Sequence, residues 1–132
     1  MNNGIDSKVY KLACKFSIKI VKQCRILRDE KEFVLSTQLL KSGTSIGANI
    51  AEANGAISMA DFSAKISISY KEALETKYWL DLLKDTDTIG LECYDELFRS
   101  VDEIAKILYS ILKTTRNINP EKKSDIADGD SR

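Results

Sequence analysis

Residues 58–83 read SMADFSAKISISYKEALETKYWLDLL, and this stretch decides the fold. Its apolar and small residues recur at alternating spacings of four and three: Phe62, Ile66, Ser69, Ala73, Thr76, Leu80 and Leu83. Such a heptad-like repeat is typical of a helix packed along a seam of a left-handed bundle. Ser58 with Asp61 three residues later is a helix-start signal, and Ile57 stands where a hydrophobic staple to Phe62 can form. We therefore predict a helix that begins after Ser58.

Three other stretches have the apolar periodicity of amphipathic helices. From about Ser7 to Arg28, one face carries Val9, Leu12, Ala13, Phe16, Ile20 and Leu27. From about Glu32 to Asn54, one face carries Leu35, Leu39, Gly43, Ile46, Ile50 and Ala53. From about Leu91 to Asn117, the repeat consists of Leu97, Val101, Ile104, Leu108 and Ile111. The single proline, Pro120, lies beyond all of these stretches.

The second of these helices is rich in small residues. Gly43 and Gly47 each cost about 1 kcal/mol relative to alanine inside a helix, a cost that is accepted where a neighbouring backbone approaches closely. The run KSGTSIGAN also resembles a phosphate-cradling loop, but the Gly-Lys-Ser/Thr ending of a P-loop is missing. We therefore predict a tightly packed helix here.

Four amphipathic helices joined by short connections predict an all-α fold, an antiparallel up-down-up-down four-helix bundle. The 132 residues suffice for one such domain, which we assign to residues 1–117. Residues 118–132 are polar and aperiodic, so we predict a disordered tail there.

The composition argues against an enzyme. The chain has no histidine, which removes the commonest general base and the commonest zinc ligand. Cys14, Cys24 and Cys93 have no metal-ligand spacing, and we expect them to be reduced. Glu72 and Glu75 share a helix face, but nothing near them supplies a nucleophile or an oxyanion donor. We predict no catalytic residue, no metal site and no cofactor.

The sequence favours a cytoplasmic protein without a membrane partner. No window approaches the ~18 uninterrupted apolar residues of a membrane span. The first residues, MNNGIDSKVYK, lack the basic-then-apolar pattern of a signal peptide.

The net charge is zero, but the charge is unevenly distributed. Residues 1–31 hold eight basic residues against three acids, and residues 85–103 hold seven acids against Arg99 alone. The lysine stripe of the first helix consists of Lys8, Lys11, Lys15, Lys19 and Lys22, and Arg25 extends it. These side chains can track the phosphates of a nucleic acid. The alternative is a solvated helix face, since no aromatic residues interleave to stack on bases.

A polar stripe runs beside the apolar face of the second helix. It consists of Gln38, Ser42, Ser45, Asn49 and Glu52, and Glu72 and Glu75 of the third helix join it. Buried between helices or subunits, such groups must hydrogen-bond one another. We therefore predict a structural polar network that fixes register.

Several apolar residues are hard to bury within a single bundle. They are Tyr10, Cys14, Val21, Phe33, Leu40, Ile68, Trp79 and Leu82. Single exposed apolar residues are common on protein surfaces. Together, however, these residues predict an interface between copies of the chain, and closed cyclic symmetry is the usual outcome.

The runs FVLSTQLLKSGTSIGANIAEA (Phe33–Ala53) and DFSAKISISYKEALETKYWLDLL (Asp61–Leu83) resemble the bacterial four-helix bundle protein family. Its members were first noticed as reading frames within intervening sequences of bacterial 23S ribosomal RNA genes, and some are therefore labelled ribosomal proteins. The family includes the accessory variability determinant of diversity-generating retroelements. The resemblance covers about residues 8–116 and is most specific at residues 45–52 and 72–80.

The resemblance implies a homopentamer, a barrel of five bundles around a central pore. It also implies that RNA or DNA, and a reverse transcriptase, bind through a basic surface. The neutral net charge departs from the basic character expected of the retroelement members. We expect a non-enzymatic, homo-oligomeric nucleic-acid-binding accessory protein. The alternative is a protein-interaction scaffold, whose acidic region at residues 85–103 docks a partner protein.

Overall fold

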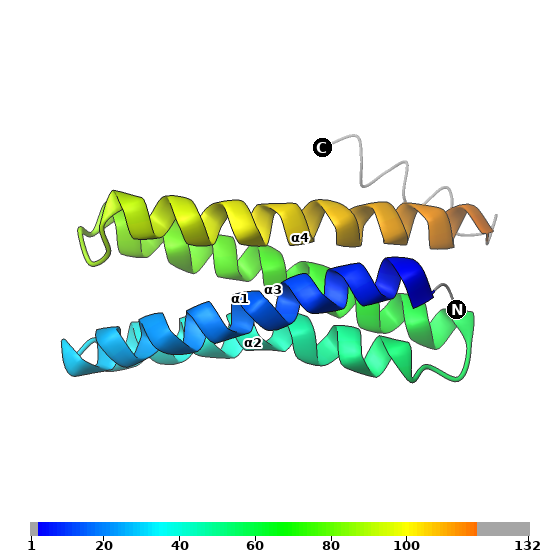
Figure 1. The fold of residues 1–132 in the computed structure, drawn as a ribbon, viewed down its shortest axis with the longest axis horizontal. Helices are drawn as coiled ribbons and strands as arrows, with labels where there is room; N and C mark the ends of the chain where they lie inside the picture. The colour runs from blue at the N-terminus through cyan, green and yellow to red at the C-terminus, as the bar shows by residue number, and fades with distance from the viewer. Residues whose placement is uncertain (1–2, 119–132) are drawn as a thin grey trace.

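The computed structural model describes the backbone of residues 3–118 and the side chains of residues 8–115. Residues 3–118 form four helices: α1 (Asn3–Asp29), α2 (Phe33–Asn54), α3 (Met59–Asp85) and α4 (Leu91–Ile118). Consecutive helices run in opposite directions, so the start of α1 and the end of α4 lie at the same end of the molecule (Figure 1). The predicted all-α, antiparallel four-helix bundle is confirmed.

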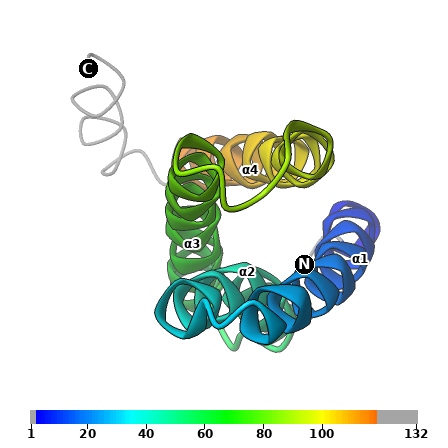
Figure 2. The ribbon, with the colours of Figure 1, turned by 90° about the vertical axis from the view of Figure 1, so that its left-hand side faces the viewer.

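The helices follow one another around the bundle axis in the order α1, α2, α3, α4 (Figure 2). α2 packs against α1 and α3, and α3 also packs against α4. α1 and α4 touch as well, but they stand farther apart than the other neighbours (Figure 2). Over residues 3–118, no helix combines the length and the apolar character that crossing a membrane requires.

The apolar faces predicted from the sequence form the core of the bundle. All of their residues are buried except Leu12 and Leu35, which are half-buried at the edge of the core.

α4 ends at Ile118. The rest of the predicted tail, residues 119–132, lies outside the described residues.

The start of α3 has the predicted polar cap. Ser58 has an extended backbone, and its Oγ accepts a hydrogen bond from the Asp61 N–H at 3.0 Å. The Asp61 carboxylate accepts a hydrogen bond from the Ile57 N–H at 3.3 Å. These two bonds satisfy one donor of the first turn and fix the chain entering α3.

The predicted staple from Ile57 to Phe62 is wrong. Phe62 is buried in the core, whereas Ile57 is 94% exposed. The Asp61 carboxylate accepts a hydrogen bond from the Ile57 N–H, so polar groups hold the chain just before α3. The isoleucine side chain stays in solvent.

α1 and α3 end in the same kind of turn. In each, a non-glycine residue adopts the left-handed conformation, Lys31 at φ 68° and Asp87 at φ 58°. The next residue donates its N–H to a carbonyl five residues back, from Glu32 to Leu27 at 2.8 Å and from Thr88 to Leu83 at 2.8 Å. This bond defines a Schellman turn, in which glycine usually occupies the left-handed position.

We predict that Lys31→Gly stabilises the protein. A left-handed residue with a Cβ costs about 1–2 kcal/mol, and the extra chain entropy of glycine offsets part of the gain. The expected net rise in the free energy of unfolding is about 0.5–1 kcal/mol. The measurement is urea unfolding at one fixed protein concentration, with Asp87→Gly as the matched control. Aspartate tolerates this conformation better, so Asp87→Gly should gain less, and an equal or larger gain there would contradict the explanation.

The close approach predicted at the small residues of α2 occurs against α1. A Cβ placed on Gly43 would lie 3.0 Å from both Cγ1 and Cγ2 of Ile20. A Cβ on Gly47 would lie 3.5 Å from the Cβ of Ala13, which is ordinary contact. Gly43 is therefore the position at which the two helices need glycine.

Candidate nucleic-acid interface

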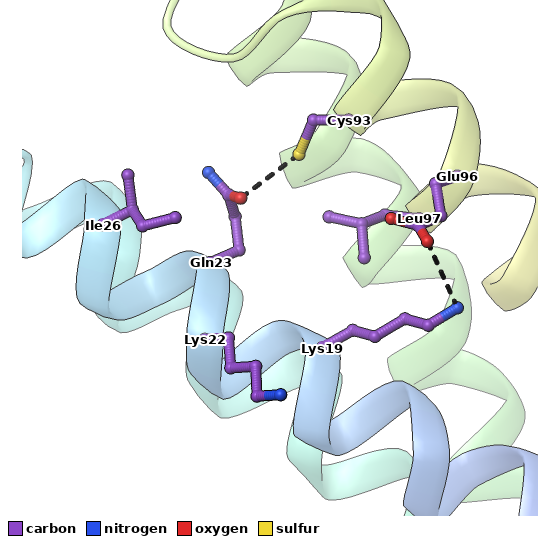
Figure 3. Close-up of a pocket in the computed structure, with 7 residues that line it drawn as sticks. All are labelled: Lys19, Lys22, Gln23, Ile26, Cys93, Glu96 and Leu97. Carbon is purple, nitrogen blue, oxygen red and sulfur yellow. Dashed lines mark hydrogen bonds and ion pairs between the residues drawn. The ribbon is translucent and has the colours of Figure 1, made fainter.

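The lysine stripe follows the edge of α1 that faces α4. Two contacts establish this position. Lys19 Nζ lies 3.7 Å from the Glu96 carboxylate of α4, and Cys93 Sγ of α4 donates a hydrogen bond to Gln23 Oε1 at 3.3 Å (Figure 3). The other predicted lysines lie three or four residues apart from Lys19 or from one another, so they continue the same edge.

Most of this stripe carries charge that no carboxylate among residues 8–115 neutralises. Lys8, Lys11, Lys15, Lys22 and Arg25 are exposed, and no ion pair involves them among the side chains of residues 8–115. Lys19 is the exception because of its contact with Glu96. Several lysines on other helices do have carboxylate partners: Lys65, Lys77, Lys84 and Lys106. The unneutralised cations of α1 therefore form a surface that favours anions.

A groove of about 180 Å³ lies between α1 and α4 beside this stripe. Figure 3 shows its lining: Lys19, Lys22, Gln23 and Ile26 come from α1, and Cys93, Glu96 and Leu97 come from α4. Glu96 places a carboxylate among the two lysines, so the groove itself is not uniformly basic. An extended polyanion is better matched by the exposed α1 edge than by this groove.

Two exposed isoleucines lie among the basic residues, and the sequence pattern did not single them out. Ile18 is 57% exposed and Ile26 is 50% exposed. Ile18 lines a shallow groove of about 300 Å³ on α1 together with Ser17, Val21, Lys22 and Arg25. Their spacing could have identified them. Neither isoleucine falls on the periodic apolar face of the helix, so neither is expected in the core. The basic edge therefore also offers apolar contact area.

The predicted polar residues do not form one connected network inside a single bundle. Among residues 8–115, no hydrogen bond joins the side chains of two of Gln38, Ser42, Ser45, Asn49, Glu52, Glu72 and Glu75. Ser42 is buried beside Thr76, and their hydroxyl oxygens are 3.0 Å apart. Asn49 donates to the Ser45 carbonyl at 2.8 Å. A network between subunits stays a prediction.

The polar groups at the α2–α3 seam pair with other partners instead. Ser69 donates to the Ile46 carbonyl at 2.8 Å in the buried part of the seam. Nearer the surface, Lys65 Nζ lies 2.8 Å from Glu52. Trp79 Nε1 donates to Glu75 at 3.0 Å. These contacts show that the seam is built from pairs, which the sequence pattern alone did not identify.

None of the eight predicted interface residues is fully buried. Tyr10, Phe33 and Ile68 are exposed, and Cys14, Val21, Leu40, Trp79 and Leu82 are half-buried. Cys14 and Val21 flank Ser17, which lies against Gly47 of α2, so they follow the α2-facing edge of α1. Ile68 and Trp79 lie on the α2-facing edge of α3, since Lys65 one turn earlier pairs with Glu52 of α2.

The outward face of α2 therefore lies between two apolar strips. Five exposed or half-buried residues run along the middle of this face. Four of them are short, Thr37, Thr44, Ala48 and Ala51, and the fifth is Lys41. We call this surface the α2 shelf, comprising these five residues with Tyr10, Cys14 and Val21 on one side and Ile68 and Trp79 on the other. Short side chains let a second helix approach closely. The lysine stripe lies on a different edge of α1 and is not part of the shelf.

The carboxylates and cysteines of residues 8–115 are the remaining side chains that commonly hold metals or act as nucleophiles. Across residues 8–115, no group of three or more acidic or cysteine side chains lies close enough to hold a metal ion. The three cysteines are free thiols. Burial raises the pKa of Cys24 to about 11, and burial with the nearby charge of Glu96 raises the pKa of Cys93. Both thiols are therefore protonated and weakly nucleophilic at neutral pH.

Comparison with known proteins gives a family and a structural neighbour. The family model described as 23S rRNA-intervening sequence protein matches residues 5–110. A crystal structure of a protein with unknown function from the S23 ribosomal protein family of Bacteroides thetaiotaomicron is 46% identical in sequence, with a TM-score of 0.80. The match covers 83% of this chain and 98% of that chain. No curated protein matches the chain.

Proposed function

This chain belongs to the family of 23S rRNA-intervening sequence proteins, and on that premise we propose that it is a non-enzymatic, homo-oligomeric nucleic-acid-binding protein. The observation that carries the proposal is the set of exposed cations on one edge of α1 that have no carboxylate partner among the side chains the structure describes. Each phosphate that such a cation neutralises releases condensed counterions, which drives binding without sequence preference. The family resemblance supports RNA or DNA as the polyanion, and a reverse transcriptase as a further partner.

Assembly explains how a neutral chain presents a basic surface. One subunit has equal numbers of acidic and basic residues. Copies joined through the α2 shelf leave the lysine stripe of each subunit uncovered, because the stripe lies on another edge of α1. Several stripes side by side produce a much larger local potential than one. The family resemblance implies five copies in a closed ring.

The acidic region offers a weaker case for a protein partner. Of its seven acids, Asp85, Glu96 and Asp102 each lie within 4 Å of a lysine of the same chain, at 3.7, 3.7 and 2.7 Å. The guanidinium or ammonium groups of a partner would have to compete with these contacts. Two lysines, Lys77 and Lys106, also hold the pKa of Asp102 below its usual value. The cations of α1 are consequently better supported as a binding surface.

The proposal is tested by replacing Lys11 and Lys15 with glutamine and measuring binding to a structured RNA and to duplex DNA by fluorescence anisotropy. We expect wild-type affinity to fall steeply with salt. The variant should bind about tenfold more weakly near 100 mM salt, and the slope of log K against log salt should shrink by about 1.8, at about 0.9 per contact.

The matched control replaces Lys71 and Lys113, which lie on α3 and α4, with glutamine. This variant loses the same charge, so it should bind like the wild type if the α1 edge is the site. Equal weakening by both variants would remove the lysine stripe from consideration. Absence of any salt-dependent binding by the wild type would remove nucleic acid as the partner, and a protein captured from lysate after nuclease treatment would then favour the scaffold.

A further inference from the structure

The shallow groove on α1 combines apolar side chains with two cations. It has a volume of about 300 Å³ and is lined by Ser17, Ile18, Val21, Lys22 and Arg25. We infer that this groove receives an unpaired base of a single-stranded nucleic acid, whose phosphates bind the neighbouring cations of the lysine stripe. The inference rests on the nucleic-acid binding proposed above and names the class of strand that is bound.

The residues that define the groove follow one face of the helix. Val21 and Lys22 lie three and four residues after Ile18, and Arg25 lies four and three residues after them, so these side chains are neighbours on the helix surface. Side chains of a helix lean toward its N-terminus, which directs Arg25 back toward Val21 and Lys22. Ile18 is 57% exposed and Val21 is half-buried. The groove therefore presents aliphatic surface directly beside exposed cations.

The two cations of the groove are available to an anion. Lys22 and Arg25 are exposed, and among residues 8–115 neither takes part in an ion pair or lies over an aromatic ring. The next arginine of α1 differs, since the Arg28 guanidinium lies 5.5 Å from the centre of the Phe33 ring. None of the lining residues is acidic, whereas Glu96 lies among the lysines of the groove between α1 and α4 (Figure 3). A phosphate is consequently better matched here than between α1 and α4.

Aliphatic surface beside phosphate-binding cations suits a single strand better than a duplex. In a duplex the bases stack on one another, and only phosphates, sugars and base edges face outward. An unpaired base has a free face, which packs on apolar side chains or on the plane of an arginine guanidinium. Aromatic rings usually provide this contact. In this groove Ile18 and Val21 supply the apolar surface, and Arg25 supplies the planar group.

A second copy of the chain matches the groove less well. Val21 forms the wall nearest α2 and belongs to the α2 shelf, so a copy joined through the shelf would lie beside the groove. None of the residues of the shelf is acidic, and Lys41 adds a further cation. A copy that brings its own shelf to this contact therefore offers Lys22 and Arg25 no opposite charge. The phosphates of a strand do.

The test compares two single strands by fluorescence anisotropy with the full wild-type chain. One is oligothymidylate of about twelve nucleotides, and the other has the same length and phosphates but an abasic sugar at every position. Because the two strands carry the same charge, the ratio of their affinities measures the contribution of the bases. We expect the wild type to bind oligothymidylate about fivefold more tightly than the abasic strand near 100 mM salt, at the low end of the usual stacking effect.

Three variants locate the contribution of the bases. Ile18→Ser removes apolar surface without changing charge, so the ratio should fall below about twofold while the salt dependence stays the same. Ile26→Ser is the matched control, because Ile26 is 50% exposed on the same helix but does not line this groove, and it should keep the wild-type ratio. Arg25→Lys keeps the charge and loses the planar guanidinium, so it should lower the ratio at an unchanged salt dependence.

The possible outcomes separate this inference from the proposed function. Salt-dependent binding with equal affinity for the two strands would overturn the inference and leave the proposed function standing. Absence of salt-dependent binding to either strand would reject the proposed function, and the inference with it. An equal loss of the ratio in Ile18→Ser and Ile26→Ser would overturn the inference alone. A lower molar mass of Ile18→Ser in light scattering would do the same, because the groove would then belong to the contact between copies.

Discussion

Gly43→Val is expected to destabilise the bundle by about 3 kcal/mol, the upper part of the usual range for overpacking a core. The Cβ alone would lie 3.0 Å from two carbons of Ile20, and valine adds two methyl groups beyond it. Ile20 is fully buried and is β-branched, so it has little freedom to turn away. The measurement is the urea midpoint at a fixed protein concentration, with the unfolding slope checked for a change.

Two companion variants locate the cause. Gly47→Ala meets only ordinary contact, with Ala13 Cβ at 3.5 Å, and should gain about 1 kcal/mol from helix propensity. Adding Ile20→Ala to Gly43→Val frees volume at the point of contact and should recover part of the loss. If Gly43→Val were as stable as the wild type, the close approach of α1 and α2 at this level would be refuted.

Ile68→Asp is expected to convert the proposed oligomer into single chains. Ile68 is 44% exposed on the α2 shelf, so aspartate is readily solvated in an isolated bundle. In an assembly joined through the shelf, each copy would bury an unpaired carboxylate, which costs several kcal/mol per subunit. That cost weakens association by more than about 100-fold, at about 1.4 kcal/mol per factor of ten.

The measurement is the molar mass from light scattering behind a size-exclusion column, together with circular dichroism to establish that the helices are intact. Leu91→Asp is the matched control, because Leu91 is also exposed and apolar but begins α4, away from the shelf. An Ile68→Asp protein that keeps the wild-type mass would exclude the α2 shelf as the interface. If Leu91→Asp also dissociated the assembly, the effect of Ile68→Asp would not be specific to the α2 shelf, and the shelf would be excluded as the specific interface.

The sequence predicted the fold because each helix carries one dominant apolar periodicity. The repeat from Phe62 to Leu83 and the cap at Ser58 are local signals, and both are confirmed. The staple at Ile57 failed because the direction of a side chain outside a helix depends on the preceding turn, where the Asp61 carboxylate holds the Ile57 N–H. Propensity and periodicity do not describe that geometry.

The candidate site was less accessible to sequence reasoning. Helical spacing grouped the lysines on one edge of α1, but it did not show that Lys19 is paired with Glu96 while Lys15 has no ion pair within residues 8–115. That distinction depends on which edge of α1 faces α4. The polar residues of α2 were identified by their pattern, yet the partner of Ser42 on the neighbouring helix is Thr76, which the repeat had placed with the core. Partners across helices require the register between them.

Assembly is the central claim, since over the described residues a single neutral chain presents one short basic edge on α1. The most direct test is the molar mass of the wild-type protein by light scattering at micromolar concentration and physiological salt. The account predicts a single species whose mass is a small whole multiple of 14.8 kDa, and the family resemblance implies five. A well-behaved species of 14.8 kDa under these conditions would contradict it.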